Sequence, residues 1–153
     1  MKSKQATLRV LLDTSFILPS LGIDVGEDVS EGLKKLADIK AEIYYSHFSI
    51  LESLWVAARL STNETFDAES FNLGLRSIIE GDRYMEVKED SKAFDEALKL
   101  HMLGHKDMID NILYANSIRL SIKLLTLDRK LKDFIHERGL KNTFIAPDEL
   151  MSS

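Results

Sequence analysis

Short apolar segments alternate along this chain with longer segments of helical periodicity, and no other feature restricts the possible folds as strongly. The short segments are rich in strand-favouring side chains and cover residues 8–12, 42–46, 84–87, 122–126 and 142–146. Helical patterns occupy residues 26–39, 49–60, 67–80, 91–103, 107–121 and 128–138. Such alternation indicates a parallel sheet covered by helices on both faces. We therefore expect an α/β fold, a three-layer α/β/α sandwich with a central, mainly parallel sheet of four to five strands.

Length and composition are consistent with one intracellular domain. No linker rich in glycine, serine or proline divides the 153 residues, so we expect residues 1–153 to form a single domain. The chain has no cysteine, which excludes a disulfide scaffold and a thiol nucleophile and suits a reducing, cytoplasmic location. Because no apolar run approaches the roughly 18 residues of a membrane span, we expect no membrane partner.

The balance of charge argues against a protein that holds DNA by a broad basic face. There are 20 lysine and arginine residues and 25 acidic residues, which gives a net charge of −5. Nucleic-acid-binding domains of that kind are usually strongly basic. An acidic chain instead leaves room for an enzyme whose carboxylates gather in one place to hold cations.

Acidic residues stand at the predicted strand ends and in the first turns of the neighbouring helices. Asp13 directly follows the first strand, and Asp128 follows the fourth. The helix before the fourth strand begins with Asp107 and Asp110, and the helix after the second strand carries Glu52 in its first turn. Ligands of parallel sheets bind beyond the carboxyl ends of the strands. We therefore expect these carboxylates to converge on one crevice.

Converging carboxylates point to a hard divalent cation. The partial positive charge of a helix N-terminus favours ionised carboxylates, but clustered carboxylates repel one another. Without a counter-charge, some of them would hold protons at neutral pH. Mg²⁺ or Mn²⁺ prefers such oxygen ligands and can activate a bound water for phosphodiester hydrolysis.

Each acidic residue also has a purely structural explanation. Asp107 and Asp128 are plausible helix N-caps, and Glu52 could close a capping box with Ser49. Asp13 is harder to explain structurally, because a carboxylate that ends a buried strand is costly unless it is paired or functional. A zinc site at His101 and His105 is not expected, since Gly104 ends the helix between them and no glutamate follows His101.

Four ordered motifs resemble those of PIN-domain ribonucleases, most closely the VapC toxin type. They are Leu11-Leu12-Asp13-Thr14-Ser15, Ser49-Ile50-Leu51-Glu52, Asp110-Asn111-Ile112-Leu113-Tyr114-Ala115 and Leu124-Leu125-Thr126-Leu127-Asp128. Each motif is short, but their order and spacing agree with the family from Leu8 to about Ala146. The resemblance implies a PIN-like fold and a Mg²⁺- or Mn²⁺-dependent endoribonuclease that hydrolyses single-stranded RNA, with single-stranded or structured RNA as the partner.

The resemblance also assigns roles to particular residues. The catalytic, metal-binding acids of the family fall on Asp13, Glu52, Asp110 and Asp128. The hydroxyls of Ser15 and Thr126 match positions that support the site by hydrogen bonds.

Three further residues, Asp107, Arg129 and Lys130, are candidates because they lie close to the predicted acids in the sequence. Asp107 lies on the same helical face as Asp110, so either could be the main ligand; the spacing to Asp128 favours Asp110 and leaves Asp107 as an outer group or the helix cap. Arg129 and Lys130 adjoin Asp128 and are candidates for RNA contact, although solvated helix charges are an equal alternative.

Several functions are compatible with this pattern. The toxin version implies a cognate antitoxin and a homodimer, whereas a stand-alone version would process RNA without an antitoxin. The sequence does not separate these two. A receiver-type phosphorylation domain and a catalytically inactive binding module are weaker alternatives, because Glu52 lies on a helix and all four acids are present.

Overall fold

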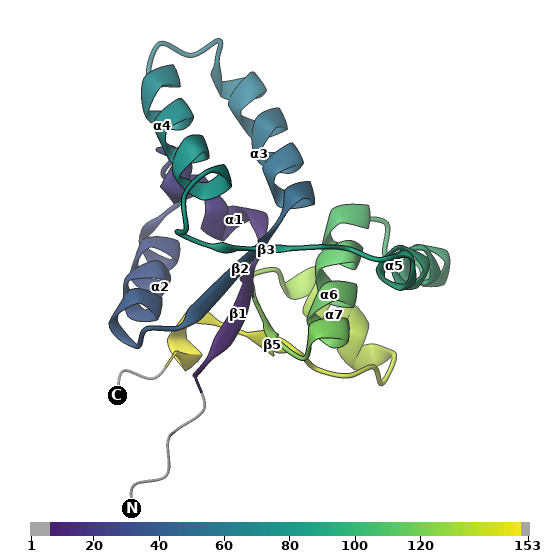
Figure 1. The fold of residues 1–153 in the computed structure, drawn as a ribbon. Helices are drawn as coiled ribbons and strands as arrows, with labels where there is room; N and C mark the ends of the chain where they lie inside the picture. Colours follow the sequence, from purple (N-terminus) through teal and green to yellow (C-terminus); the bar gives the residue numbers. More distant parts are fainter. Residues whose placement is uncertain (1–6, 151–153) are drawn as a thin grey trace, which may run out of the picture.

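A parallel sheet of five strands forms the centre of the computed structural model, which describes residues 7–150 (Figure 1). The strands lie in the order β3-β2-β1-β4-β5, and every neighbouring pair is parallel. Their bounds are β1 Arg9–Leu12, β2 Glu42–Ser46, β3 Met85–Val87, β4 Lys123–Leu125 and β5 Phe144–Ile145. The register places Leu11 opposite Tyr44 and Leu124. The predicted strands are confirmed, and the sheet is wholly parallel.

Helices connect the strands. Their bounds are α1 Thr14–Ile17, α2 Glu27–Asp38, α3 His47–Leu60, α4 Ala68–Ile79, α5 Ser91–Leu103, α6 Met108–Leu120 and α7 Arg129–Glu137, with 3₁₀ helices η1 Leu18–Leu21 and η2 Pro147–Glu149. Four of them begin after an aspartate whose carboxylate accepts a backbone N–H of the first turn: Asp67, Asp90, Asp107 and Asp128. These caps explain why the boundaries of α4 to α7 agree with the sequence pattern.

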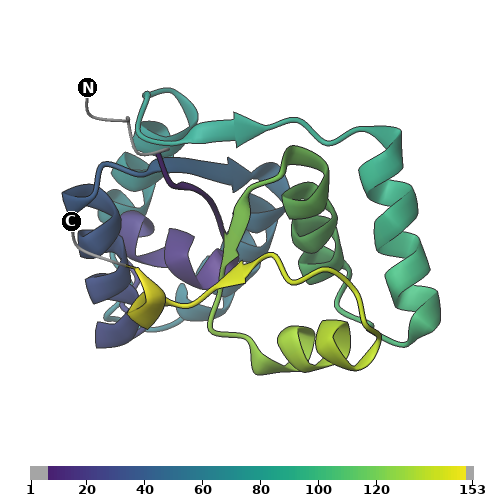
Figure 2. The same cartoon turned by 90° about the horizontal axis from the view of Figure 1, so that it is seen from below.

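The helices form one layer on each face of the sheet, which confirms the predicted sandwich. Figures 1 and 2 show α1 to α4 on one side and α5 to α7 on the other. Alternating side chains of β1 point to opposite faces of the sheet. Val10 and Leu12 pack in the core beneath α1 to α4, and Leu11 packs in the core beneath α5 to α7. All three are fully buried, as a strand covered on both faces requires.

Two local features differ from the sequence-based expectation. The segment directly after Asp13 forms the short helices α1 and η1, which the sequence pattern did not predict. Helices of four residues are too short to show a helical periodicity in the sequence. The predicted capping box of Ser49 and Glu52 is wrong, because α3 begins earlier and Ser46 is its N-cap. The Ser46 hydroxyl accepts the backbone N–H of Phe48 at 3.1 Å.

The strand order creates one place where the chain changes direction within the sheet. From β1 the chain proceeds through β2 to β3 on one side, and then crosses to β4 on the other side of β1. The carboxyl ends of β1 and β4 therefore flank a topological switch point, where parallel sheets commonly bind ligands. Within residues 7–150, no helix has both the length and the apolar character needed to cross a bilayer.

Candidate active site

A pocket of about 390 Å³ opens at this switch point. We call it the acid pocket, and its lining is Asp13, Thr14, Ser15, Glu52, Asp107, Asp110, Leu127 and Asp128. The five acidic residues predicted to converge thus lie together, although they come from four separate regions of the chain. Because the strands are parallel, their carboxyl ends and the helix starts that follow meet at this edge.

The ends of β1 and β4 hold Asp13 and Asp128 side by side. The backbone N–H of Asp13 donates to the carbonyl of Leu125 at 3.2 Å, which continues the pairing of the two strands. Thr126 joins the two acids, since its hydroxyl donates to Asp13 Oδ2 at 2.5 Å and accepts the backbone N–H of Asp128 at 2.9 Å. This buried threonine therefore has the supporting position expected for it.

The first turn of α6 supplies two further acids with different surroundings. Asp107 is the N-cap, and its Oδ1 accepts the backbone N–H of Asp110 at 3.1 Å. Capping engages the carboxylate of Asp107, whereas no backbone N–H among residues 7–150 donates to the carboxylate of Asp110. Asp128 likewise caps α7, accepting the backbone N–H of Lys130 at 2.9 Å. Both capping explanations are correct, and both caps still line the pocket.

Burial and mutual repulsion dominate the electrostatics of the acid pocket. Burial raises the pKa of Asp13 to about 6, and the charge of Asp128 contributes to the rise. For Asp110, burial, a hydrogen bond with Asp128 and the charges of Asp107, Asp128 and Asp13 raise the pKa to about 9. The Asp110 carboxyl therefore holds a proton at neutral pH unless a cation is bound, as expected for uncompensated clustered carboxylates.

The donor set of the acid pocket fits a hard divalent cation. All its charged groups are carboxylates, and Asp13 Oδ1 is buried without a hydrogen-bond partner. A cation would satisfy that oxygen and relieve the repulsion that protonates Asp110. Within residues 7–150, no three histidine or acidic side chains already stand close enough to hold one ion. Binding would therefore require side-chain adjustments within the pocket.

Comparison with known families identifies the fold. The family model described as "PIN domain" matches residues 10–136, which is most of the chain and includes all five acids of the pocket. The chain belongs to the PIN domain family. PIN domains are nucleases, and this family membership excludes the receiver-type alternative.

Solved structures share the fold of this PIN domain at low sequence identity. VapBC2 from Rickettsia felis, bound to a DNA fragment from its promoter, is 13% identical with a TM-score of 0.62, covering 91% of this chain and 98% of that one. PAE2754 from Pyrobaculum aerophilum is 15% identical (TM-score 0.62, 94% and 86%). A toxin–antitoxin complex from Klebsiella pneumoniae is 14% identical (TM-score 0.58, 90% and 97%). No curated protein sequence matches the chain.

Of the other predicted site residues, Ser15 lines the acid pocket, whereas Arg129 and Lys130 lie outside it. Ser15 lines the acid pocket and is exposed. Arg129 and Lys130 are exposed on α7 and do not line it. Arg129 instead lines a neighbouring cleft of about 340 Å³, which shares Leu127 with the acid pocket.

Two pocket residues were absent from the sequence-based set. Thr14 and Leu127 each adjoin a predicted acid, so proximity to Asp13 and Asp128 was the signal available for them. Thr14 Oγ1 is buried without a partner, like Asp13 Oδ1 beside it. The exposed Leu127 separates the acid pocket from the neighbouring cleft.

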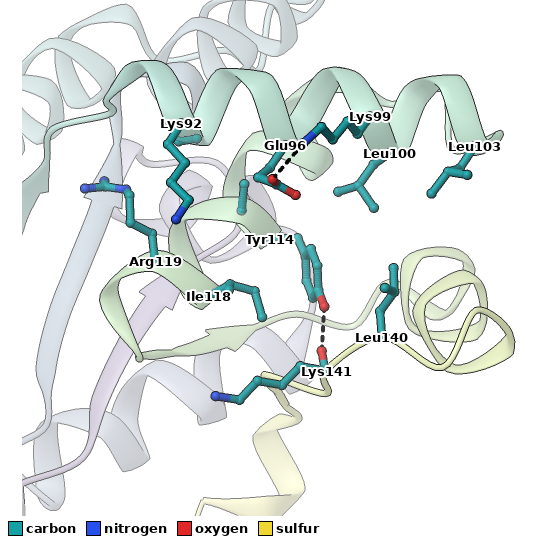
Figure 3. Close-up of a pocket in the computed structure, with 12 residues that line it drawn as sticks. Lys92, Glu96, Lys99, Leu100, Leu103, Tyr114, Ile118, Arg119, Leu140 and Lys141 are labelled. Atoms are coloured by element: carbon teal, nitrogen blue, oxygen red, sulfur yellow. Dashed lines mark hydrogen bonds and ion pairs between the residues drawn. The ribbon is translucent and has the colours of Figure 1, made fainter.

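A larger cavity, of about 660 Å³, lies between α5 and α6 and has a different chemistry (Figure 3). Apolar side chains such as Leu100 and Leu103 line it, and the Tyr114 hydroxyl donates to the carbonyl of Lys141 at 2.6 Å. Its one lining carboxylate, Glu96, forms an ion pair with Lys99 at 3.4 Å. Size alone would favour this cavity, but the acid pocket gathers five carboxylates, and the pKa values of two of them, Asp13 and Asp110, are raised.

Proposed function

We propose that this PIN domain is a metal-dependent endoribonuclease that hydrolyses phosphodiester bonds of single-stranded RNA. The observation that carries the proposal is the acid pocket, where the carboxylate of Asp13, with one buried and unpartnered oxygen, shares one lining with four other carboxylates. Bound Mg²⁺ or Mn²⁺ would lower the pKa of a water and neutralise charge that develops on the phosphate.

The individual acids differ in their suitability as ligands. Asp13, Asp110 and Asp128 would hold the cation and Glu52 would assist, in agreement with the family resemblance. Asp110 must lose its proton to act as a ligand, because its pKa is raised to about 9. Asp107 is given the outer role because the spacing to Asp128 favours Asp110 as the ligand; capping alone does not separate them, since Asp107 and Asp128 both cap a helix. Thr126 keeps Asp13 oriented through its hydroxyl hydrogen bond.

Basic side chains beside the acid pocket could contact the phosphates of a nucleic-acid strand. The neighbouring cleft is lined by Lys35, Arg129 and Lys132, and it adjoins the acid pocket at Leu127. Three acidic residues also line this cleft, so its attraction for phosphates is local and modest. We infer that the strand passes from the acid pocket over Leu127 toward Arg129. Lys130, exposed on the same helix, could contact RNA outside the cleft.

The test is a cleavage assay on single-stranded RNA with Mg²⁺, Mn²⁺ or EDTA, using wild type and Asp13→Asn. We expect metal-dependent cleavage by wild type, and a loss in Asp13→Asn that exceeds the roughly 10–100-fold effect typical of supporting residues. Asp133→Asn, an exposed acid on α7, is the matched control and should retain activity. A DNA strand of the same sequence tests selectivity for RNA. Undiminished metal-dependent cleavage by Asp13→Asn would contradict the proposed site.

We also propose that the nuclease is the toxin of a toxin–antitoxin pair. Support comes from the toxin–antitoxin complex with the same fold and from the α3–α4 hairpin, which projects from the sheet (Figure 1). Its exposed apolar side chains are Leu51, Leu54, Trp55, Leu73 and Ile79. Such a patch suits a protein partner, and an antitoxin arginine could reach the carboxylates of the neighbouring acid pocket.

The only tryptophan of the chain makes the antitoxin proposal testable. Trp55 is 53% exposed and lies one turn beyond Glu52 on α3. The purified product of a neighbouring short reading frame should inhibit cleavage and shift the Trp55 fluorescence to shorter wavelength. Absence of any such partner would favour the stand-alone RNA-processing alternative.

A homodimer is the remaining part of the proposal. Helix α5 exposes Phe94, Leu98 and Met102, which recur every four residues and form one apolar stripe. A second copy of the chain is the partner we propose for this stripe.

A further inference from the structure

Glu89 forms a bridge between two elements that each carry an acid of the pocket, although Glu89 does not line the pocket itself. It lies in the loop between β3 and α5 and is half-buried. Its Oε2 accepts a hydrogen bond from Ser46 Oγ at 2.6 Å and another from Asn116 Nδ2 at 2.8 Å. Both donor residues are fully buried. One carboxylate oxygen therefore joins the end of β2 to α6.

Both donors belong to the framework of the acid pocket. Ser46 ends β2 and is the N-cap of α3, whose second turn carries Glu52. Asn116 lies on α6, whose first turn carries Asp110. Helices α3 and α6 contact each other directly. The Glu89 bridge thus connects the start of the Glu52 helix with the body of the Asp110 helix.

Neighbouring contacts hold the bridge in one orientation. Arg119 donates to Asn116 Oδ1 at 3.2 Å, so the amide of Asn116 presents its nitrogen to Glu89. The same guanidinium donates to the carbonyl of Lys88 at 2.8 Å, and its Nε lies 3.7 Å from Asp90 Oδ1. The residues on both sides of Glu89 are therefore also tied to α6, and the carboxylate is preorganised.

We propose that Glu89 is a positioning residue of the nuclease, and that it holds Glu52 and Asp110 at the separation needed to share one cation. This inference rests on the proposed function. Carboxylates that repel one another favour separation of the helices that carry them, and hydrogen bonds across those helices oppose that separation. Catalytic groups need a geometry accurate to about 0.5 Å, which second-layer contacts of this kind supply.

The test compares Glu89→Ala with Glu89→Gln. Alanine removes the bridge, whereas the amide oxygen of glutamine can accept the same two hydrogen bonds. Mn²⁺ affinity is measured by calorimetry, and kcat and KM are measured on RNA below the melting temperature of every variant. We expect Glu89→Ala to lower Mn²⁺ affinity and kcat by about tenfold with little change in KM, and Glu89→Gln to recover most of both.

Two further variants keep the test decisive. Asn116→Ala removes the second donor without altering Glu89, and it should reproduce the Glu89→Ala effect without adding to it in the double variant. It replaces Glu89→Ala if that variant does not fold. Glu86→Ala is the matched control on the preceding strand: it removes an exposed contact between Glu86 Oε1 and His47 Nε2 at 3.5 Å and should behave as wild type.

The outcomes separate this inference from the proposed function. If Glu89→Ala lowers only the melting temperature and leaves Mn²⁺ affinity and kcat unchanged, the bridge is structural and the inference is wrong. Failure of Glu89→Gln to recover Mn²⁺ binding also contradicts it, because the carboxylate charge rather than the hydrogen bonds would then matter. If wild type neither binds Mn²⁺ nor cleaves RNA, the proposed function fails, and the inference fails with it.

Discussion

Asp110 is the residue whose chemistry depends most on its surroundings. Its place in the first turn of α6 favours the ionised carboxylate through the helix dipole. Burial and the neighbouring carboxylates outweigh that effect and raise its pKa to about 9. Without a cation, the folded protein therefore holds a proton at Asp110 that the unfolded chain releases near pH 4. Stability and metal binding are linked through this proton.

The raised pKa values predict that the metal-free protein loses stability as the pH rises. The folded-state pKa values of Asp13 and Asp110 are about 6 and 9, both above the ordinary 3.8. The folded state therefore binds more protons than the unfolded state, and these two groups contribute least to stability above pH 9. Calorimetry in EDTA should show a lower melting temperature at pH 8 than at pH 5. Mn²⁺ at pH 8 should raise it again.

Asp110→Asn isolates the contribution of this carboxyl. Asparagine cannot ionise, so at pH 8 in EDTA we expect a gain of at least about 1 kcal/mol, or roughly 2–4 °C in melting temperature. The pH dependence should flatten, and metal-dependent cleavage should be lost. The same scans on Asp133→Asn, which changes an exposed acid, provide the control. A variant less stable than wild type at pH 8 would contradict the raised pKa of Asp110.

Thr126→Val tests the hydroxyl that joins Asp13 and Asp128. Valine has the same shape but cannot donate to Asp13 Oδ2 or accept the N–H of Asp128. We expect kcat to fall by roughly 10–100-fold and stability by about 1–3 kcal/mol, the cost of unpartnered buried groups. Thr126→Ser keeps the hydroxyl and should retain most activity. Equal activity of the two variants would show that the hydroxyl does not support the site.

Among the elements, α6 contributes most to the site, and a buried amide holds its first turn in place. Asn111 Nδ2 donates to the carbonyls of His105 and Ala97 at 2.8 and 3.3 Å. The amide oxygen Oδ1 of Asn111 can only accept a hydrogen bond. Its contact with His105 Nδ1 at 2.7 Å is therefore a hydrogen bond in which Nδ1 carries the proton and donates. This network joins α5, the following loop and α6. It also accounts for His105 without a zinc ion.

Replacement of Asn111 by alanine should destabilise the junction of α5 and α6. The carbonyls of His105 and Ala97 and the His105 ring would lose their hydrogen bonds to the buried amide of Asn111. We therefore expect the free energy of unfolding to fall by about 2–4 kcal/mol. Urea unfolding followed by circular dichroism measures it. Asn63→Ala removes one exposed hydrogen bond of 3.3 Å and should cost less than about 0.5 kcal/mol. Similar losses in both variants would mean that burial of the amide is unimportant.

Two exposed apolar surfaces lie on or beside the helices that carry acids of the pocket, because α3 carries Glu52 and α5 packs against α6, which carries Asp110. One is the α3–α4 hairpin, and the other is the stripe of Phe94, Leu98 and Met102 on α5. Phe48 of α3 packs edge-on against Phe94 with ring centroids 5.6 Å apart, so the two surfaces approach each other there. Exposed apolar patches of this kind are typical of protein interfaces. An antitoxin and a second copy could therefore both bind near the site.

Leu98→Glu tests the proposed homodimer. Leu98 is 50% exposed in the middle of the α5 stripe, and a charge there would be buried without a partner in a dimer. Light scattering should give a dimer mass for wild type and a monomer mass for the variant, with Mn²⁺ binding retained. Leu73→Glu, a similarly exposed leucine on α4, should remain dimeric. A monomeric wild type would contradict the proposal.

Most of the fold could be predicted because its signals are local. Each helix from α4 to α7 begins at a capping aspartate, and the strands lie within short segments rich in apolar, strand-favouring side chains. Helix α1 was missed, since a four-residue helix has no periodicity of its own. The start of α3 was misplaced for a related reason: Ser46 and Ser49 both precede plausible first turns, and only the observed backbone distinguishes them.

The five acids of the pocket were all recognisable in the chain, because parallel strands bring their carboxyl ends to one edge whatever the details of packing. Other properties depended on contacts between distant residues. Thr126 and Asp13 are 113 positions apart, and Glu89 is 43 and 27 positions from its partners Ser46 and Asn116. The proton on Asp110 follows from burial among other carboxylates. Burial and hydrogen-bond partners arise from three-dimensional packing, which local sequence patterns do not encode.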